Sequence, residues 1–456
     1  GIYVQNSAGV VIGGSNSADG NVIANGKRIG ILAVDAASNV LIENNIIGLA
    51  ADGTTIAANT QSGIETKDTN GVTIRNNTLS GNGASGIHLV SSPSSSIINN
   101  RIGTDTSGNL DKGNKGTGID VQTASANLTI NGNVISGNDS HGIQFTDGDA
   151  SGTLVYDNRI GTTQNGSAAL ANNGAGILVN KTPNLTIGST SSAGNTISGN
   201  GQSGINLFND QTNLLSKNIT IVGNNIGVSK DATTAIANTA HGVLIQHVSD
   251  VKIGDGTVSG SNRIAYNNQA GLQITGTTNN VTVNRNAIYA NNQLGIDLNM
   301  DVISLNDAND VDTGPNAILN APIISSMILN GANMTLTGCA PAGSVVEVYE
   351  ADVSTGGAAT AGANRFSKSK DYGEGQSFLT SFTEGSSADT DSGNCALPVD
   401  ADGNNQTGMQ AFTITTTKPA TIADKDLITA TATVNGVGTS EFGTVTSVGP
   451  ITCSLV

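Results

Sequence analysis

Apolar residues recur along the first two thirds of the chain in one short phrase: a glycine, a branched aliphatic residue, any residue, and usually a second aliphatic residue. Eleven glycines open such a phrase: Gly1, Gly30, Gly63, Gly86, Gly118, Gly142, Gly176, Gly204, Gly242, Gly271 and Gly295. Alternating apolar positions are typical of a β-strand with one buried face. Successive phrases begin 23 to 38 residues apart, by subtraction of these numbers. A repeat of this length predicts a solenoid.

Two further short apolar runs follow the phrase in each repeat, and the second of them has the form Asn, any residue, Ile or Leu. The asparagines that precede it are Asn21, Asn45, Asn77, Asn100, Asn133, Asn158, Asn195, Asn224, Asn262 and Asn286. Gly, Asn, Ser and Asp separate the runs, and no helical period lies between them. We therefore predict an all-β fold in which residues 1–315 form about eleven three-stranded rungs of a parallel β-helix.

The composition agrees with a narrow, stacked interior. Aliphatic side chains at alternate positions would point inward and stack on the next rung, about 4.8 Å away. Only 3% of the residues are aromatic and Trp is absent, whereas 59 of the 456 residues are Gly. We expect the asparagine at a fixed place in each rung to form a ladder of amide hydrogen bonds along the coil axis.

The net charge of −16 at pH 7 comes without a basic cluster. Acidic chains are repelled by phosphate backbones and by anionic headgroups, so we expect no nucleic-acid partner and no membrane insertion. Because Gly1 already lies inside a repeat phrase, we also expect that a leader or further sequence precedes it.

Alternate repeats carry an inserted loop after the third strand. The four loops begin at Gly48, Gly103, Gly161 and Gly227. Loops on every second rung would lie about 9.6 Å apart and would form one ridge along the coil.

Several stretches resemble the right-handed parallel β-helix repeats of large secreted bacterial surface proteins, which share the pectate lyase superfold. They are NRIGTDTSGN (100–109), LTIGSTSSAGN (185–195) and NTISGNGQSGI (195–205). The resemblance covers roughly residues 1–315 and implies the fold. It implies no particular activity, because the same coil occurs in lyases, hydrolases, epimerases, tailspikes, adhesins and stalks.

The residue after the first aliphatic of each phrase is expected to face outward. Glu65, His88 and Asp120 take this position on three consecutive rungs. Two carboxylates two rungs apart would lie about 9.6 Å from each other, near the upper end of the separation in inverting glycosidases. The trio is therefore the candidate catalytic site, with an imidazole between two carboxylates.

The same trio also has a plain structural interpretation. Outward positions of a coil in water require polar side chains, so three titratable residues there need no catalytic role. The Arg-based elimination motif of the pectate lyases is absent, and aromatic residues that could stack on sugars are scarce. We favour the non-catalytic interpretation on the sequence alone.

An acidic stretch ends the coil between residues 295 and 316. Its candidate metal ligands are Asp297, Asp301, Asp307, Asn309, Asp310 and Asp312. Calcium prefers hard oxygen ligands of this kind, although the spacing does not match the EF-hand loop. Two interpretations remain open here, a calcium site and a solvated acidic linker.

From residue 316 to residue 456 the pattern changes to longer alternating strands separated by Pro and Gly turns. We predict an antiparallel β-sandwich of immunoglobulin-like type for this module. All the cysteines, Cys339, Cys395 and Cys453, lie in it. In an oxidising compartment one disulfide would form, with Cys339 and Cys395 as one candidate pair and Cys453 as the odd thiol.

These observations predict an extracellular or cell-surface structural protein, a non-catalytic subunit of a self-assembling fibre, surface layer or adhesin. Its partners would be further copies and a surface polysaccharide. The copies would join head to tail, with the first rung covered either by the sandwich of a neighbouring copy or by a strand donated from the residues beyond Gly449. The alternative is a secreted protein that binds or degrades polysaccharide, as a hydrolase or lyase, through the trio.

Overall fold

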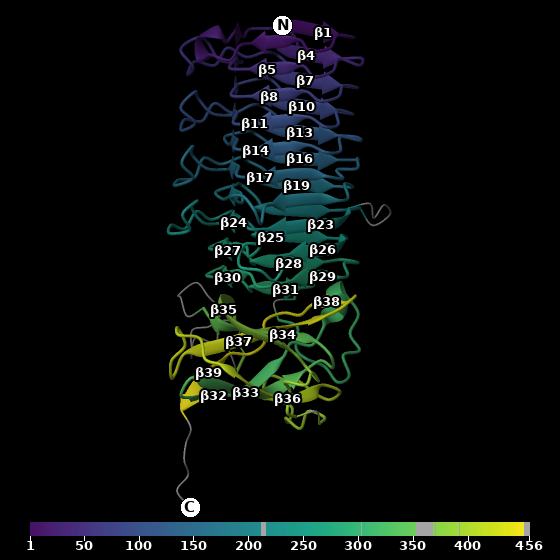
Figure 1. Ribbon diagram of the computed structural model, residues 1–456, viewed down its shortest axis with the longest axis vertical. Helices are drawn as coiled ribbons and strands as arrows, with labels where there is room; N and C mark the ends of the chain where they lie inside the picture. The colour runs from purple at the N-terminus through teal and green to yellow at the C-terminus, as the bar shows by residue number, and fades with distance from the viewer. Residues whose placement is uncertain (211–215, 302, 353–367, 370, 392, 451–456) are drawn as a thin grey trace, which may run out of the picture. The chain divides into compact units, whose positions relative to one another are not determined.

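The computed structural model describes residues 1–210, 216–301, 303–352, 368–369, 371–391 and 393–450. The chain forms two compact units, residues 1–244 and 245–456, and each is described by itself (Figure 1). Among the described residues, no helix combines the length and the apolar character needed to span a bilayer.

Each glycine phrase forms a strand, and these strands make the first face of the coil. In the first unit they pair in parallel and in chain order from β1 to β22, with the aliphatic positions in register. The phrase strands are β1 (Ile2–Gln5), β4 (Ile31–Val34), β7 (Ile64–Lys67), β10 (Ile87–Val90), β13 (Ile119–Gln122), β16 (Ile143–Thr146), β19 (Ile177–Asn180), β22 (Ile205–Phe208), β25 (Val243–Gln246), β28 (Leu272–Thr275) and β31 (Ile296–Leu298).

The second run of each repeat makes the second face. Its strands are β2 (Val11–Gly13), β5 (Leu41–Glu43), β8 (Thr73–Arg75), β11 (Ser96–Ile98), β14 (Thr129–Asn131), β17 (Thr153–Tyr156), β20 (Leu185–Gly188), β23 (Lys217–Val222), β26 (Ser249–Ile253) and β29 (Val281–Val283). They also pair in parallel with their equivalents on the neighbouring rung, as β26 does with β29 in the second unit.

The third run, which follows the asparagine, makes the third face. Its strands are β3 (Val22–Ile23), β6 (Ile46–Ile47), β9 (Thr78–Leu79), β12 (Arg101–Ile102), β15 (Val134–Ile135), β18 (Arg159–Ile160), β21 (Thr196–Ile197), β24 (Asn225–Ile226), β27 (Arg263–Ala265) and β30 (Ala287–Tyr289). A short 3-10 turn, η1 (Ser17–Asp19), lies before β3. The predicted three-stranded parallel rungs are therefore confirmed.

The interior of the coil is a stack of aliphatic side chains. On the first face Ile31, Ile64, Ile87, Ile119 and Ile143 have no exposed surface. Because the rungs are in register, each of these side chains packs on its equivalent in the next rung, and burial of an aliphatic side chain contributes about 1.5–3 kcal/mol.

The predicted asparagine ladder is present. In the first unit the side-chain Nδ2 of each asparagine donates to the Oδ1 of its equivalent one rung further along, from Asn21 to Asn224. Asn77, for example, also donates to the carbonyls of Ile42 and Arg75 and is fully buried. The ladder therefore pairs the backbone groups that the sharp corner between two strands leaves free.

A second ladder runs along another corner of the coil. It includes the asparagines that end the inserted loops, together with their equivalents on the plain rungs: Asn59, Asn82, Asn114, Asn138, Asn172, Asn200 and Asn238. The sequence shows these asparagines, but their amide chain was not predicted.

The four inserted loops project from the same side of the first unit (Figure 1). Backbone hydrogen bonds connect each loop to the one before it: the N–H groups of Thr106, Gln164 and Lys230 donate to the carbonyls of Gly53, Gly108 and Gly166. The loops thus form one continuous ridge in this unit.

The second unit contains an antiparallel module after the last coil strands. The turn η2 (Pro315–Ile318) leads into its strands, which are β32 (Ile323–Asn330), β33 (Asn333–Ala340), β34 (Val345–Ala351), β35 (Gly375–Thr383), β36 (Gln410–Thr417), β37 (Leu427–Val434), β38 (Gly438–Thr439) and β39 (Thr446–Pro450). The strand pattern thus changes at the predicted place, although β26 to β31 belong to the same compact unit as the module.

The module has two groups of antiparallel strands, and β39 connects them because it pairs with β32 in parallel and with β37 in the antiparallel sense. β33 pairs with β32 and β36, and β34 pairs with β35 and β37, all antiparallel. Apolar residues from both groups, including Leu336, Val346 and Phe412, share one buried core. Cys339 and Cys395 form a disulfide with their Cα atoms 5.7 Å apart. The immunoglobulin-like topology stays a prediction, and Cys453 lies outside the described residues.

Acidic side chains of the module cover the last coil strands. The buried carboxylate of Glu374 accepts hydrogen bonds from the backbone N–H and the side-chain Nδ2 of Asn291, where the next ladder asparagine would otherwise stand. Asp352 accepts from the N–H of Ala290, and Glu347 accepts from the N–H of Arg285. These carboxylates take the place of a further rung.

We expect Asn77→Ala to lower the free energy of unfolding, because it leaves buried partners on two rungs unpaired at about 1–3 kcal/mol for each lost partner. Urea unfolding followed by circular dichroism measures the change. The matched control is Asn109→Ala in an exposed loop, with an expected change within about 0.5 kcal/mol. Equal effects of the two substitutions would show that the ladder adds no stability.

Candidate functional site

Glu65, His88 and Asp120 lie side by side on the first face of the first unit. They occupy β7, β10 and β13, and His88 is the register partner of both Glu65 and Asp120. The residues on either side of each, such as Ile87 and Leu89, are fully buried in the interior. The two-residue period of the strand therefore turns all three polar side chains outward.

The imidazole of His88 faces both carboxylates. Its Nδ1 lies 3.4 Å from Oε2 of Glu65, and its Nε2 lies 3.8 Å from Oδ2 of Asp120. The exposed fractions of the side chains are 24% for Glu65, 22% for His88 and 15% for Asp120. The trio is thus accessible from solvent but only partly hydrated.

Burial changes the acidity of one member of the trio. It raises the pKa of Asp120 above the ordinary value for Asp, while the imidazole of His88 and a hydrogen bond from Gln122 act in the opposite direction. Two polar atoms here, Nε2 of His88 and Oδ1 of Asp120, are buried without a hydrogen-bond partner. Both atoms lie beneath the surface of the face, between the strands that carry the trio.

Gln122 is a neighbour of the trio that sequence reasoning did not single out. Its Nε2 donates to Oδ2 of Asp120 over 3.0 Å. Gln122 stands two residues after Asp120 on the same strand, so the period-2 rule that identified the trio also points to it. It holds the carboxyl group of Asp120 in a fixed orientation beside His88.

The predicted calcium ligands fall into two groups in the second unit. Asp297 and Asp301 come together with Glu441 of the module, and their carboxylate oxygens lie within 4.8 Å of one another. Glu441 is 140 residues or more away in the sequence, and no local pattern marked it. Asp307, Asn309, Asp310 and Asp312 follow in the chain and are not members of this cluster, although burial and the carboxylates of Asp307 and Asp301 raise the pKa of Asp312.

Glu441 is buried and holds two backbone segments together. Its carboxylate accepts hydrogen bonds from the N–H groups of Leu298 and Ser304. Burial raises its pKa well above the ordinary value for Glu, and the carboxylates of Asp297 and Asp301 raise it further. Asp297 is buried as well, rather than facing outward as its place in the phrase predicted, and burial raises its pKa.

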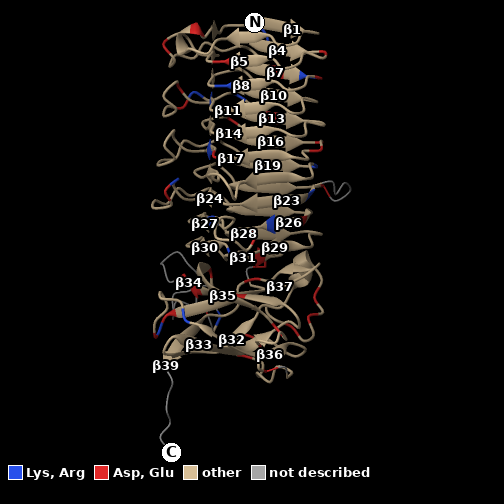
Figure 2. Ribbon diagram, viewed as in Figure 1, with Lys and Arg blue, Asp and Glu red and all other residues tan. Residues whose placement is uncertain are grey.

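Charged residues elsewhere follow the loops more than the strands (Figure 2). On the second face of the first unit, the guanidinium of Arg75 lies 2.6 Å from the buried carboxylate of Glu43. This ion pair links two neighbouring rungs. Because each charge is neutralised by the other, the pair suits a structural role better than a reactive one.

We expect the stability of the second unit to fall as the pH rises from 5 to 8. A carboxyl group whose pKa is higher in the folded than in the unfolded state stabilises fully below the unfolded pKa, and this contribution is lost as the pH rises through the folded pKa. Glu441→Gln should reduce the fall in melting temperature between these two pH values. Thermal unfolding in chelator measures it.

The matched control for this pH series is Glu350→Gln, which changes the same charge at a half-buried position on β34. It should leave the pH dependence unchanged. If the melting temperature of Glu441→Gln changes with pH as that of the unaltered chain does, the buried carboxyl group does not couple proton binding to folding.

Comparisons with known proteins bear mainly on the coil. The alginate epimerase AlgG, described as periplasmic, is 15% identical, with a TM-score of 0.39 over 65% of this chain and 62% of its own length. The Azotobacter vinelandii mannuronan C-5 epimerase AlgE4 A-module is 17% identical, with a TM-score of 0.34 over 64% of this chain and 76% of its own. DFA-IIIase from Arthrobacter chlorophenolicus A6 is 13% identical, with a TM-score of 0.32 over 62% of this chain and 71% of its own. This chain therefore spans less than two thirds of the AlgG chain.

The family described as "Right handed beta helix region" matches residues 1–180 and 52–246. These two overlapping matches span more than half of the 456 residues. They cover the rungs from β1 to β25, where the phrase strands, the asparagine ladders and the trio lie. The chain belongs to the right-handed β-helix region family.

Proposed function

We propose that this chain binds and cleaves a polysaccharide on the first face of its coil, with Glu65, His88 and Asp120 as the reactive groups. The observation that carries the proposal is the position of His88, whose two ring nitrogens each face a carboxylate from a neighbouring rung. The register of the strands brings an imidazole and two carboxylates into one coupled group on a face that solvent reaches.

The environments of the two carboxyl groups suggest different roles in the hydrolysis of a glycosidic bond. Burial raises the pKa of Asp120, which favours its protonated form and suits it to give a proton to the leaving glycosidic oxygen. Glu65 would take a proton from the water that attacks the anomeric carbon as the C–O bond breaks. His88 would position both groups by its contacts with them.

The spacing of the carboxyl groups favours inversion of the anomeric carbon. Glu65 and Asp120 stand on strands two rungs apart, which corresponds to about 9.6 Å between equivalent backbone positions. Inverting enzymes separate their carboxyl groups by about 6.5–9.5 Å, close to this backbone spacing, whereas retaining enzymes hold them closer. The imidazole of His88 occupies the space directly between Glu65 and Asp120, so the attacking water would stand on the solvent side of the ring.

We expect Glu65→Gln and Asp120→Asn each to lower kcat/KM at least about 100-fold on a polysaccharide that the unaltered chain cleaves. Alginate and polygalacturonate are the first substrates to test, by release of reducing ends, with proton NMR to read the anomeric configuration of the first product. The matched control is Asp147→Asn, an exposed carboxylate beyond β16.

Two results would contradict the assignment of the trio. One is cleavage that persists in both variants at the rate of the Asp147→Asn control. The other is binding of a polysaccharide without turnover in the unaltered chain, which would leave the coil as a binding protein.

The disulfide between Cys339 and Cys395 supports an oxidising compartment. Such bonds persist mainly in oxidising environments outside the cytosol. We therefore place the chain among secreted proteins, where soluble polysaccharide and the cell surface are both accessible.

The second candidate function is the structural one, a rigid subunit of a fibre, surface layer or adhesin. It is supported by the two asparagine ladders, of which the first runs from Asn21 to Asn224 and the second from Asn59 to Asn238. A stack tied at two corners is suited to bear load. The strand predicted to join copies head to tail includes residues 451–456, which lie outside the described residues.

Calcium would act in this second function. We place the predicted ion at the cluster of Asp297, Asp301 and Glu441, because three carboxylates within 4.8 Å of one another repel each other unless a proton or a cation intervenes. A divalent ion there would tie the end of the coil to the module within the second unit.

If copies assemble, light scattering and electron microscopy of the purified chain should show regular filaments or sheets in calcium, and chelator should dissolve them. Asp301→Asn should need a higher calcium concentration to assemble than the control Asp424→Asn needs. The control removes an exposed charge elsewhere in the module. A monomer in every condition would contradict the assembly.

A further inference from the structure

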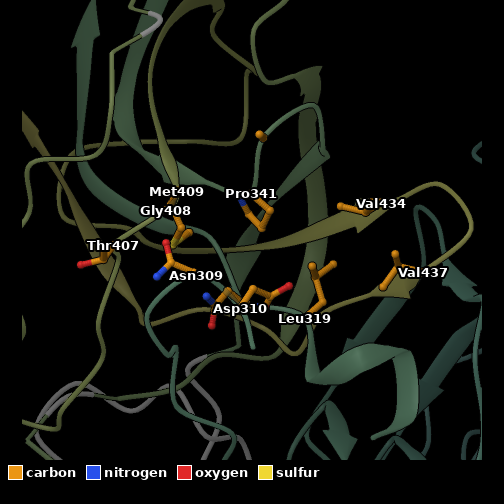
Figure 3. A pocket seen from close by; sticks show the side chains of 11 residues that line it. Asn309, Asp310, Leu319, Pro341, Thr407, Gly408, Met409, Val434 and Val437 are labelled. Carbon is orange, nitrogen blue, oxygen red and sulfur yellow. The ribbon is translucent and has the colours of Figure 1, made fainter. Parts of the chain in front are cut away.

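A cavity of about 230 Å³ opens in the second unit between the acidic stretch and the antiparallel module. The stretch contributes Asn309 and Asp310, and the module contributes residues from three separate segments that include Pro341, Met409 and Val437. Figure 3 shows the lining side chains converging on one space. The catalytic and structural functions proposed above use none of these side chains.

The cavity has one apolar end. Val434 and Val437 lie at the side away from Thr407, and Leu319 lies near them (Figure 3). Leu319 and Met409 are almost fully buried, with 5% and 2% of their surfaces exposed. Val434 and Val437 are half-buried, so the apolar surface still exposed at this end belongs to them, and an occupant with an apolar portion would remove it from water.

The other end is polar and acidic. Asp310 is half-buried, and its Oδ1 accepts a hydrogen bond from the backbone N–H of Asn320 over 2.8 Å. Burial raises the pKa of Asp310, and the nearby carboxylates of Asp307 and Asp312 raise it further. Oδ1 of Asp307 is buried without a hydrogen-bond partner. Asp310 is the one acidic side chain among the residues that line the cavity, and none of the lining residues is basic.

Backbone and amide contacts hold the acidic wall in place. The side chain of Asn320 accepts from the N–H of Asp307 and donates to its carbonyl, both over 2.9 Å. The N–H of Asn309 donates to the carbonyl of Thr407 over 2.7 Å. Asn309 and Asp310 both have left-handed backbone conformations, with φ of 62° and 51°. The wall is fixed before anything binds, which lowers the entropic cost of binding.

We propose that this cavity binds the side chain of an arginine or lysine from a partner polypeptide. The aliphatic stem would lie against Leu319, Val434 and Val437, and the cationic head would reach the carboxylate of Asp310. Long basic side chains combine these two properties, an apolar stem and a charged end. A bare metal ion would leave the apolar end empty, and an apolar ligand would leave the acidic end unmatched.

The four methionines of the chain provide the measurement. Met409 lines the cavity, whereas Met327 and Met334 are buried in the core of the module and Met300 is exposed. With ¹³C-labelled methionine methyl groups in the full chain, N-acetyl-arginine amide or N-acetyl-lysine amide should shift the Met409 signal and leave those of Met327 and Met334 in place. Chelator keeps divalent ions from the carboxylates.

The uncharged analogue of arginine tests the role of charge. N-acetyl-citrulline amide should bind at least about tenfold more weakly than the arginine compound, because a charge-assisted hydrogen bond is replaced by a neutral one. Asp310→Asn should cause a similar loss, whereas the control Asp424→Asn should not. The signals of Met327 and Met334 report whether each variant keeps its fold.

Three results would overturn the proposal. They are equal binding of the arginine and citrulline compounds, full binding by a folded Asp310→Asn variant, and a Met409 signal that responds to calcium but to neither basic compound. If Asp310→Asn does not fold, the comparison of arginine with citrulline on the unaltered chain still decides.

Discussion

Hydrogen bonding along the coil axis is the interaction on which this structure depends. Parallel strands pair their backbone groups with the rungs above and below, but the sharp corners between strands leave further groups that water cannot reach. Asparagine solves this problem at two corners, since one amide donates to its own rung and to the next and also accepts from its neighbour. The need for these hydrogen bonds fixes asparagine at the corner but does not restrict the number of residues between two corners. Repeats of unequal length can therefore share one register.

A stack of this kind has an unpaired edge wherever it stops. In the second unit the last coil strands donate N–H groups to carboxylates of the module, and Glu374 bonds Asn291 as an asparagine would. Carboxylates suit an edge that presents donors, because they accept without donating. The cost is the burial of negative charge, visible in the raised pKa values of Glu347 and Glu441. Proton uptake or a cation relieves that cost, so the end of the coil responds to its medium more than its middle does.

The parts of the fold that depend on residue type at a fixed interval could be predicted from the sequence. The phrase strands and the ladder from Asn21 onward are local and repeated, so each repeat supports the others. The trio of Glu65, His88 and Asp120 followed from the same period. Glu441 could not be predicted in this way. It lies far in the sequence from its partners Asp297 and Asp301, and it stands outside the repeats, so no regular spacing marks it. The cavity beside Asp310 is formed by non-repeating segments that come together only in the folded chain. No pattern in the sequence therefore predicts it.

Repetition also indicates where chemistry can be placed on such a coil. Identical residues on neighbouring rungs pair with one another and with the nearby backbone, as the asparagines do, and leave no side-chain group for a ligand. Where neighbours differ in type, polar atoms are left over. On the first face the atoms buried without partners include Nε2 of His88, Oδ1 of Asp120, Oδ1 of Asn180 and Oδ1 of Asn206. All four belong to outward positions between β10 and β22, where acid, imidazole, amide and aliphatic side chains alternate. Here the residue type at the outward position changes from rung to rung. That change, and not the mere presence of titratable groups, distinguishes the part of the coil suited to recognise a ligand from the part that only stacks.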